Sequence, residues 1–113
     1  MSEDILSTLP APVQQFVTAI NTGDTEAFVA VFTADGYVDD WGRVLSGPDG
    51  VRSWAGSDAI GAGAQMTILT AEVEGDTVST HFSWSSNVFN GESDGIFTLA
   101  GDKIAGFRIP PAH

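Results

Sequence analysis

The sequence predicts one α+β domain in which helices pack on one face of a curved, mainly antiparallel sheet. Apolar residues recur at helical spacing in the first half of the chain, and alternating apolar and polar residues with turn signals fill the second half. A run of helices followed by a run of strands is typical of a sheet covered on one face. The length of 113 residues suits one core, so we expect a single domain over residues 1–113.

The first two helices are predicted from their apolar residues and from signals at their ends. Four apolar residues fall at positions i, i+3, i+4 and i+7, namely Val13, Phe16, Val17 and Ile20. Pro12 suits the first turn of this helix. Gly23 fits a left-handed C-cap, and Asp24 fits the N-cap of a second helix over about residues 25–33. The two helices should form a hairpin that turns its apolar residues toward a common partner.

A short strand is predicted next, entered by a turn at Asp35-Gly36. Neighbouring side chains in a strand face opposite ways, so Asp39 and Asp40 cannot share a face. One should face water and the other the interior. Burial in apolar surroundings makes a carboxylate easier to protonate. The inward aspartate is therefore the simplest general acid or base that this chain could make.

A third helix and a loop should follow this strand. Pro48 suits a helix start, and Val51, Trp54 and Ala55 supply the apolar face. Residues 56–64 contain three glycines, so we expect a mobile loop there, at the rim of any cavity. The loop has no lysine and no phosphate-binding pattern.

Antiparallel strands make up the rest of the chain. They are expected over residues 65–74, 77–89, 93–99 and about 103–109. Turns are expected at Gly75-Asp76 and Asn90-Gly91, and Pro110 with Pro111 should end the last strand. In the second strand, Phe82 and Trp84 should face the helices, whereas His81 should lie on the outer face.

Composition excludes several classes of function. Four basic residues against fifteen acidic ones give a formal charge of −11, which repels phosphate backbones and argues against a nucleic-acid partner. No apolar run approaches the roughly 20 residues of a membrane span. No basic-then-apolar signal follows the acidic start, so we expect no export and a cytoplasmic protein. The absence of cysteine removes thiolate metal sites, and we expect no metal and no cofactor.

Three stretches resemble the nuclear transport factor 2-like superfamily, and within it the ketosteroid isomerase and SnoaL-like polyketide cyclase branch. They are residues 13–24, residues 32–40 and residues 47–54. The resemblance runs from about residue 13 to the end of the chain. It implies a cone-shaped α+β barrel of the cystatin-like kind, with a cavity between sheet and helices. It specifies function weakly, because the fold hosts isomerases, dehydratases, cyclases, epoxide hydrolases and non-catalytic domains.

The resemblance also implies a set of site residues. It places the catalytic base on Asp40 and a pocket-lining aromatic residue on Trp54. The inward strand positions that it implies are Phe82, Trp84, Ser86, Val88, Phe97, Phe107 and Ile109. Together with Trp41, the two tryptophans Trp54 and Trp84 could line an apolar ligand site, although core packing explains each of them equally well. For Asp40, a solvated carboxylate at the end of a strand is the alternative reading.

Two positions depart from the isomerase pattern. The tyrosine that stabilises a developing oxyanion falls on Phe16, which has no hydroxyl group, and its aspartic acid partner falls on Gly95. Loss of one such donor typically costs about 10²–10³ in rate, so we do not expect steroid isomerase activity. Polarisation of a substrate oxygen would have to come from water, Ser86, Thr67 or Tyr37.

Two functions remain open on this sequence. The first is an enzyme that isomerises, cyclises or eliminates from a small apolar or aromatic molecule, with Asp40 as general acid or base and Phe16 among the residues that contact the substrate. The second is a non-catalytic ligand-binding or dimerisation domain of the same fold. The discriminating feature is whether Asp40 lines a cavity that is open to solvent.

The outer face of the sheet suggests assembly. His81 shares this face with serines and Asn87, so the face looks nearly uncharged on a very acidic chain. Proteins of the resembling fold commonly pair through this face, and we expect a two-fold homodimer with this strand in the interface. The dimer should weaken as pH falls through the histidine range, provided that no carboxylate takes up the charge. With His113 at the terminus, His81 makes a poor metal site.

Overall fold

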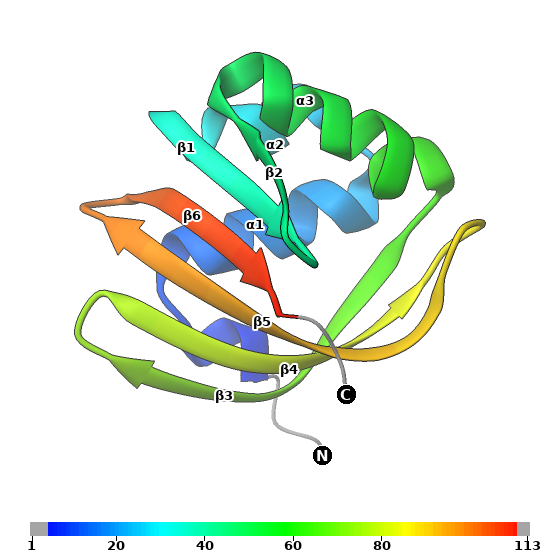
Figure 1. Cartoon of the computed structure of the whole chain (residues 1–113). Helices are drawn as coiled ribbons and strands as arrows, with labels where there is room; N and C mark the ends of the chain where they lie inside the picture. The colour runs from blue at the N-terminus through cyan, green and yellow to red at the C-terminus, as the bar shows by residue number, and fades with distance from the viewer. Residues whose placement is uncertain (1–4, 111–113) are drawn as a thin grey trace.

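The computed structural model describes residues 5–110 and places three helices against one face of a six-stranded sheet (Figure 1). The α-helices are α1 (Ala11–Thr22), α2 (Thr25–Ala30) and α3 (Gly47–Asp58), with short 3-10 turns η1 (Ile5–Thr8) and η2 (Ile60–Ala62). The strands are β1 (Phe32–Asp40), β2 (Arg43–Ser46), β3 (Gln65–Glu74), β4 (Thr77–Ser85), β5 (Asn90–Ala100) and β6 (Lys103–Ile109). The predicted α+β architecture is confirmed. The expectations for residues 1–4, Pro111 and His113 lie outside the described residues.

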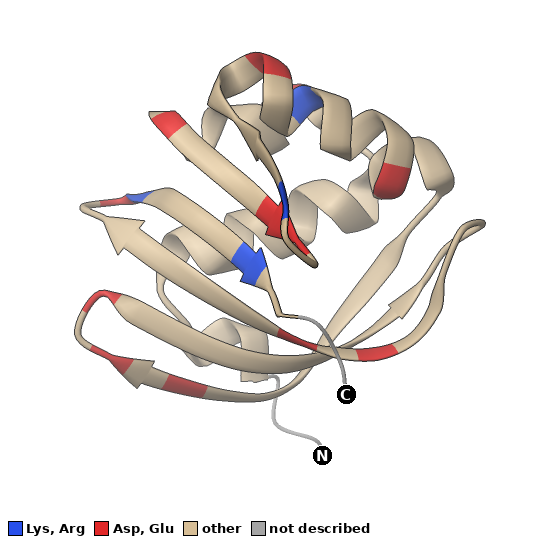
Figure 2. Cartoon of the chain, in the orientation of Figure 1, with Lys and Arg blue, Asp and Glu red and all other residues tan. Residues whose placement is uncertain are grey.

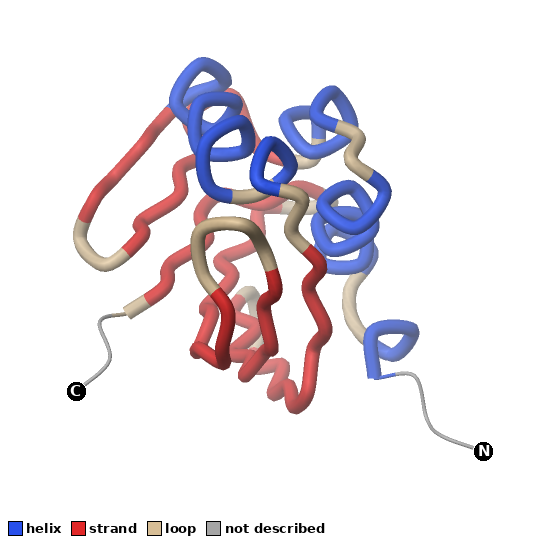
Figure 3. The backbone as a smooth tube through the Cα atoms, turned by 90° about the vertical axis from the view of Figure 1, so that its right-hand side faces the viewer, coloured by secondary structure: helices blue, strands red, loops and turns tan. Residues whose placement is uncertain are grey.

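The sheet has the strand order β2-β1-β6-β5-β4-β3, and only the β1–β6 pair is parallel. The sheet curves around the helices, which gather on its concave side (Figure 3). Strands β2 and β3 form its two edges, so the sheet described by residues 5–110 stays open rather than closing into a complete barrel. The space between the helices and the curved sheet contains the core and, at one end, the candidate site.

The helix ends follow the predicted signals, but the second helix is shorter than expected. Gly23 adopts the left-handed conformation with φ of 76°, and the side chain of Asp24 accepts a hydrogen bond from the Ala27 N–H at 3.0 Å. Helix α2 ends at Ala30, three residues before the predicted end. The Val31 carbonyl accepts a hydrogen bond from the Ile104 N–H at 2.8 Å, which brings the chain into the sheet at once.

Strand β1 therefore begins earlier than predicted. The pair Asp35-Gly36 is part of the strand, at a register shift against β6, and the predicted turn there is wrong. Gly36 is the residue that the irregularity needs, because a Cβ atom at this position would lie 3.0 Å from both the Ile104 carbonyl oxygen and the Phe32 ring.

The predicted loop over residues 56–64 is wrong for most of its length. Helix α3 continues to Asp58, and Ile60–Ala62 forms η2. A Cβ atom on Gly61 would lie 1.7 Å from the Gly56 carbonyl oxygen. The glycines therefore allow a tight backbone contact, rather than marking an irregular loop.

Two further details of the strands were not foreseen. The short edge strand β2 was missed, because its four residues carry too little alternation to stand out. Strand β4 ends at Ser85, and the turn occupies residues 86–89, so the hairpin predicted at Asn90-Gly91 is wrong. Asn90 is already paired with Ser85 across the hairpin.

The core is aromatic and lies between α1, α2 and the inner face of the sheet. Phe16 is fully buried at its centre, with ring-centroid distances of 4.7 Å to Phe107, 4.9 Å to Phe97 and 5.0 Å to Phe28. The predicted apolar face of the first helix is confirmed, and so is the prediction that Phe82 faces the interior. This packing fills most of the concave side and leaves one end open.

Candidate functional site

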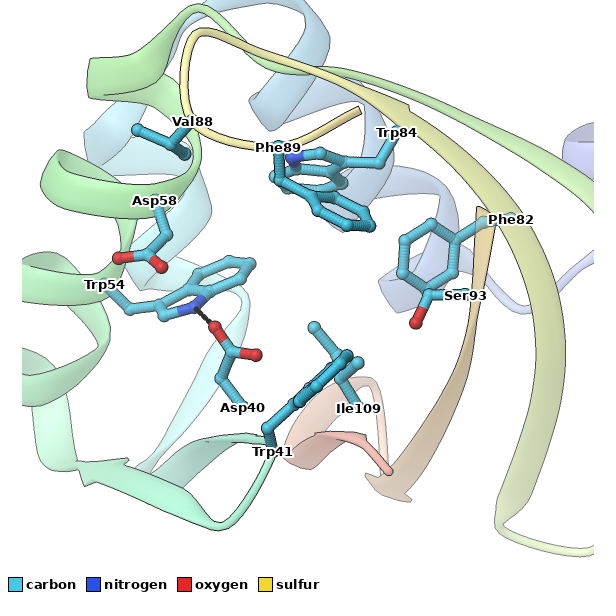
Figure 4. Close-up of a pocket in the computed structure, with 10 residues that line it drawn as sticks. All are labelled: Asp40, Trp41, Trp54, Asp58, Phe82, Trp84, Val88, Phe89, Ser93 and Ile109. Atoms are coloured by element: carbon cyan, nitrogen blue, oxygen red, sulfur yellow. Dashed lines mark hydrogen bonds between the residues drawn. The ribbon is translucent and has the colours of Figure 1, made fainter. Parts of the chain in front are cut away.

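The open end holds a cavity of about 240 Å³ between the carboxyl ends of β1 and β6, helix α3 and the β4–β5 hairpin (Figure 4). Drug-sized ligands usually occupy roughly 300–1,000 Å³, so this cavity suits a smaller molecule or part of a larger one. Ten residues line it: Asp40, Trp41, Trp54, Asp58, Phe82, Trp84, Val88, Phe89, Ser93 and Ile109.

Asp40 is the last residue of β1 and turns its carboxylate to the cavity. Its Oδ2 atom accepts a hydrogen bond from the indole N–H of Trp54 at 3.1 Å, and the side chain of Asp40 is 22% exposed. Trp54 is almost fully buried on α3, so the donor is fixed in place. Among residues 5–110, no hydrogen bond reaches the second oxygen, Oδ1. Figure 4 shows this oxygen turned toward the open space.

Asp39 lies on the opposite face of β1, as strand geometry requires. Its Oδ1 atom accepts a hydrogen bond from the Gly42 N–H at 2.8 Å, and its Oδ2 atom lies 3.8 Å from Nε of Arg108. Asp39 therefore shapes the β1–β2 turn, and Asp40 is the aspartate that faces the cavity.

A second carboxylate and one arginine stand beside Asp40. Asp58, at the end of α3, accepts a hydrogen bond from Nη2 of Arg43 at 3.0 Å. The same Nη2 atom lies 3.8 Å from Oδ2 of Asp40. Ser57 also donates a short hydrogen bond to Asp58. Arg43 is more than half exposed, so its guanidinium bridges the two carboxylates from the solvent side of the cavity.

Trp41 lines the cavity from a strained position. It has φ of 57°, a left-handed conformation that costs a non-glycine residue on the order of 1–3 kcal/mol. Together with Gly42 it forms the tight turn between β1 and β2, where asparagine is the usual first residue. The Trp41 N–H donates to the Ile109 carbonyl at 2.9 Å, and this bond holds the turn against β6.

Aromatic rings form the other walls. The ring centroids of Trp54 and Trp84 are 5.9 Å apart with planes inclined by 47°, and those of Phe82 and Trp84 are 6.0 Å apart at 65°. The planes of neighbouring rings are therefore inclined to one another and do not stack in parallel. Val88 and Phe89 project from the β4–β5 turn and remain 63% and 45% exposed, so they form an apolar rim.

Ser93 is the one side chain with a hydroxyl group among the described residues that line the cavity. It extends from β5 on the wall opposite Asp40 (Figure 4). Within the described part of the chain its hydroxyl group has no hydrogen-bond partner, so it can donate to or accept from a bound molecule. Sequence reasoning missed it, although a period of two counted back from Phe97 places Ser93 on the inner face.

The structure brings six of the sequence-predicted site residues to the cavity: Asp40, Trp41, Trp54, Phe82, Trp84 and Ile109. Val88, which the family resemblance placed inward, also lines it. Asp58 was missed, although it lies one helical turn after Trp54 on α3 and so shares its face. Phe89 was missed because it lies in a turn, where no periodicity applies.

Four predicted site residues lie elsewhere. Phe16, Phe97 and Phe107 are fully buried in the aromatic core. Ser86 belongs to the β4–β5 turn, where its hydroxyl group accepts hydrogen bonds from the N–H groups of residues 88 and 89. The chain leaves the strand before Ser86, so the alternation that pointed this side chain inward no longer applies.

The two positions that depart from the isomerase pattern are filled by the core. A Cβ atom on Gly95 would lie 2.7 Å from the ring of Phe107 and 2.8 Å from the ring of Phe82. An aspartate therefore does not fit there without moving both rings. Thr67 and Tyr37 also lie away from the cavity, because Thr67 is on the outer face and the ring of Tyr37 covers Gly106.

The outer face of β4 and β5 is more highly charged than the sequence suggested. Nδ1 of His81 lies 2.8 Å from Oδ1 of Asp94, and Nε2 lies 2.9 Å from Oε1 of Glu92. Hydrogen bonds to Asp94 and then Glu92 raise the pKa of His81. Both carboxylates are supplied by the neighbouring strand, so the expectation of a nearly uncharged face is wrong. Both belong to β5, along which Figure 2 shows acidic residues in red.

Within residues 5–110, no helix is long and apolar enough to cross a membrane. No group of three or more histidine, aspartate or glutamate side chains in this range is arranged to hold a metal ion.

The sequence and the fold both match known proteins. Residues 13–107 match the model of the SnoaL-like domain. A proposed polyketide cyclase from Sinorhizobium meliloti is 24% identical, with a TM-score of 0.82 over 92% of this chain and 97% of that one. A protein of ketosteroid isomerase-like fold from Catenulispora acidiphila, solved with trimethylamine, is 20% identical, with a TM-score of 0.77 over 91% and 86%.

A third similar structure is SalBIII, described as an epoxide hydrolase/cyclase-like enzyme in pyran ring formation in the polyether salinomycin. It is 21% identical, with a TM-score of 0.76 over 88% of this chain and 86% of that one. At these identities the likeness shows the fold. No curated protein matches the sequence significantly.

Proposed function

The chain belongs to the SnoaL-like domain family, and from this membership we propose that its cavity binds a small, largely apolar organic molecule and that Asp40 exchanges a proton with it. The reaction would be an isomerisation, a cyclisation or an elimination, each of which needs proton transfer. The chemistry attributed to two of the similar structures, polyketide cyclisation and pyran ring formation, is of this kind.

The geometry of Asp40 carries the proposal. One carboxylate oxygen is held by the indole of Trp54, and the other faces a cavity with aromatic walls. A general base must reach its proton within about 2.6–3.2 Å, directly or through one water molecule. An oxygen that is fixed in direction and free of other partners meets this requirement for a molecule bound in the cavity.

Ser93 supports the same proposal from the opposite wall. Its hydroxyl group could orient a substrate oxygen while Asp40 acts on a nearby carbon or oxygen atom. A single serine is a weak replacement for two oxyanion donors, and each lost donor typically costs about 10²–10³ in rate. We therefore favour reactions that develop little negative charge on the substrate, and steroid isomerisation is not expected.

A non-catalytic ligand-binding domain is the second candidate. The observation that favours it is the replacement of both oxyanion positions by Phe16 and Gly95, around which the core packs closely. Binding without turnover would separate the two candidates.

The test combines an unbiased ligand screen with one isosteric variant. Native mass spectrometry against small polyketide-like, terpenoid and epoxide molecules identifies binders, and each binder is then followed for conversion. Asp40→Asn should retain binding and abolish conversion. Asp94→Asn, which changes a carboxylate on the opposite face, is the matched control and should retain both. Conversion that survives in Asp40→Asn would remove this residue from the chemistry, and binders that are never converted would favour the second candidate.

We also propose that the protein pairs through the outer face of β4 and β5. A hollow of about 400 Å³ lies there beside His81 and Ile96, with room for a side chain of a second copy. A stable pair should bury at least about 1,000 Å² in total. Sedimentation at neutral pH tests this, and a monomer at micromolar concentration would contradict it.

The pH dependence first expected for this dimer no longer holds. Its condition was that no carboxylate takes up the histidine charge, and Asp94 and Glu92 both contact the imidazole of His81. Protonation of His81 would therefore reduce the negative charge of the face. A dimer formed through this face should be at least as stable at pH 6 as at pH 8.

A further inference from the structure

We propose that the ligand of the Asp40 cavity carries a positive charge, as an organic ammonium ion does. This inference rests on the proposed ligand-binding role of the cavity and adds the chemical class of the ligand. Three properties of the cavity support it: the charge of the lining, the aromatic rings and the position of the opening.

The lining is negatively charged. Among residues 5–110, the charged side chains that line the cavity are the two carboxylates of Asp40 and Asp58, and no lysine or arginine of this range does so. Arg43 neutralises part of this charge from outside, which leaves a formal charge of −1 around the cavity. An anionic ligand would be repelled, and a neutral apolar ligand would shield Oδ1 of Asp40 from solvent without giving this oxygen a hydrogen-bond donor. A cation satisfies that oxygen and balances the charge.

The aromatic walls favour the same kind of ligand. The faces of aromatic rings carry partial negative charge, and several rings set at angles around one space are the usual cage for quaternary ammonium groups. The inclined pairs Trp54–Trp84 and Trp84–Phe82 provide two corners of such a cage. Trp41 lies on the far side, beside Asp40 (Figure 4). The strained backbone of Trp41 is consistent with a positioning role for its ring.

The size of the cavity sets the size of the charged group. A volume of 240 Å³ corresponds to about eight water molecules at roughly 30 Å³ each, which is enough for a trimethylammonium group and a short chain. The exposed side chains of Trp41, Val88 and Phe89 surround the opening, so the apolar remainder of a longer ligand could lie along them. The formal charge of −11 on the whole chain would also attract cations to the opening.

Paired ligands that differ only in charge test this inference. Choline and 3,3-dimethylbutan-1-ol have nearly the same shape, but only choline is charged. All three tryptophans of the chain line the cavity, so intrinsic fluorescence reports binding, and calorimetry provides an independent check. We expect choline to bind at least about tenfold more tightly than the alcohol at low salt. Benzyltrimethylammonium, which adds an aromatic ring for the rim, should bind more tightly still.

Aspartate variants and added salt test whether the preference for a cation arises from the carboxylates of the cavity. Asp40→Asn and Asp58→Asn should each remove most of the preference for the cation, whereas Asp94→Asn, on the outer face, should leave it unchanged. Ionic strength of about 0.5 M should weaken binding of the cations and have little effect on the alcohol.

The outcomes separate this inference from the proposed function. Equal binding of choline and the alcohol would overturn the preference for a cation and leave an apolar pocket in place. Failure of both ammonium ions to bind at millimolar concentration would also overturn the inference, and the screen of neutral molecules would then decide the fate of the pocket by itself. A preference that persists in both aspartate variants would show that the cation binds elsewhere.

Discussion

The two faces of the sheet differ in kind, and the alternating residues of strand β5 contribute to both. Ser93, Gly95 and Phe97 face the helices, and Glu92 and Asp94 face away from them. The outer face holds a histidine between two carboxylates, a group that looks more like a catalytic site than anything on the inner face. Its members are exposed and satisfy one another. The inner face offers one carboxylate with a free oxygen, beside a cavity.

A polar atom that lacks a hydrogen-bond partner inside a cavity is therefore a better sign of a candidate site than a cluster of charges on the surface. Surface ion pairs contribute little energy and leave nothing for a ligand to complete. Asp40 has a rigid donor on one oxygen and an open space before the other, so a bound molecule can complete its hydrogen bonding.

Removal of an aromatic side chain from the inner face should cost the most. Phe82 is almost fully buried, so Phe82→Ala should lower the free energy of unfolding by about 3–5 kcal/mol. Ser83→Ala, one residue later on the outer face, should change it by less than about 0.5 kcal/mol. Urea denaturation measures both. Similar losses in the two variants would erase the distinction between the faces.

A methyl group added to the inner face of the sheet should lower the free energy of unfolding more than one added to the outer face. Gly95→Ala places a Cβ atom against the rings of Phe107 and Phe82, which the core holds, and should cost about 1–3 kcal/mol. Gly106→Ala meets the outer end of the Tyr37 ring, at 2.4 Å from its Cζ atom. Tyr37 is only half-buried and can move aside, so this substitution should cost less. Urea denaturation of both variants decides the order, and a larger loss for Gly106→Ala would contradict it.

Much of this inner face could be predicted from the sequence. Regular periodicity in α1 and β4 correctly placed Phe16 and Phe82 in the interior. The helix caps at Gly23 and Asp24 could be predicted because a single residue determines each cap. Asp40 was assigned to the cavity from the resemblance, and its partner Trp54 came from the same source. Local patterns sufficed wherever the structure is regular.

The remaining features depend on contacts between distant segments. The register shift in β1 follows the hydrogen bond between the Ile104 N–H and the Val31 carbonyl. These two residues are far apart in the sequence, so no local pattern encodes their contact. Phe89 reaches the cavity because the β4–β5 turn folds over it, with Asn87 N–H bonded to the Ala62 carbonyl at 2.9 Å. The carboxylates around His81 come from β5, so parity along β4 alone could not reveal them.

The hydrogen bond between Trp54 and Asp40 should contribute a smaller but measurable amount. Trp54→Phe keeps an aromatic ring and removes the donor to Oδ2, whereas Trp84→Phe makes the same change at a residue that donates no hydrogen bond within the described chain. We expect Trp54→Phe to lower the free energy of unfolding by about 1 kcal/mol more than Trp84→Phe, because a charged acceptor loses its donor. Equal losses in urea denaturation would show that the carboxylate is held by other means.

The charged groups of the outer face should affect stability mainly through its pH dependence, and this should be the smallest of the expected effects. Asp94 and Glu92 raise the pKa of His81, so they favour the protonated imidazole in the folded protein. Such a group contributes stability that is fully present below its unfolded pKa of about 6.5 and is lost as pH rises through the higher folded value. The urea midpoint of the wild type, relative to that of His81→Ala, should therefore be higher near pH 6 than near pH 8. NMR titration should give His81 a pKa above about 6.5 that falls in Asp94→Asn, while inner-face ligand binding stays the same. If Asp94→Asn left the pKa of His81 unchanged, the carboxylate of Asp94 on β5 would have no influence on the imidazole on β4. The outer face would then behave as the nearly uncharged surface that the sequence of β4 alone predicted.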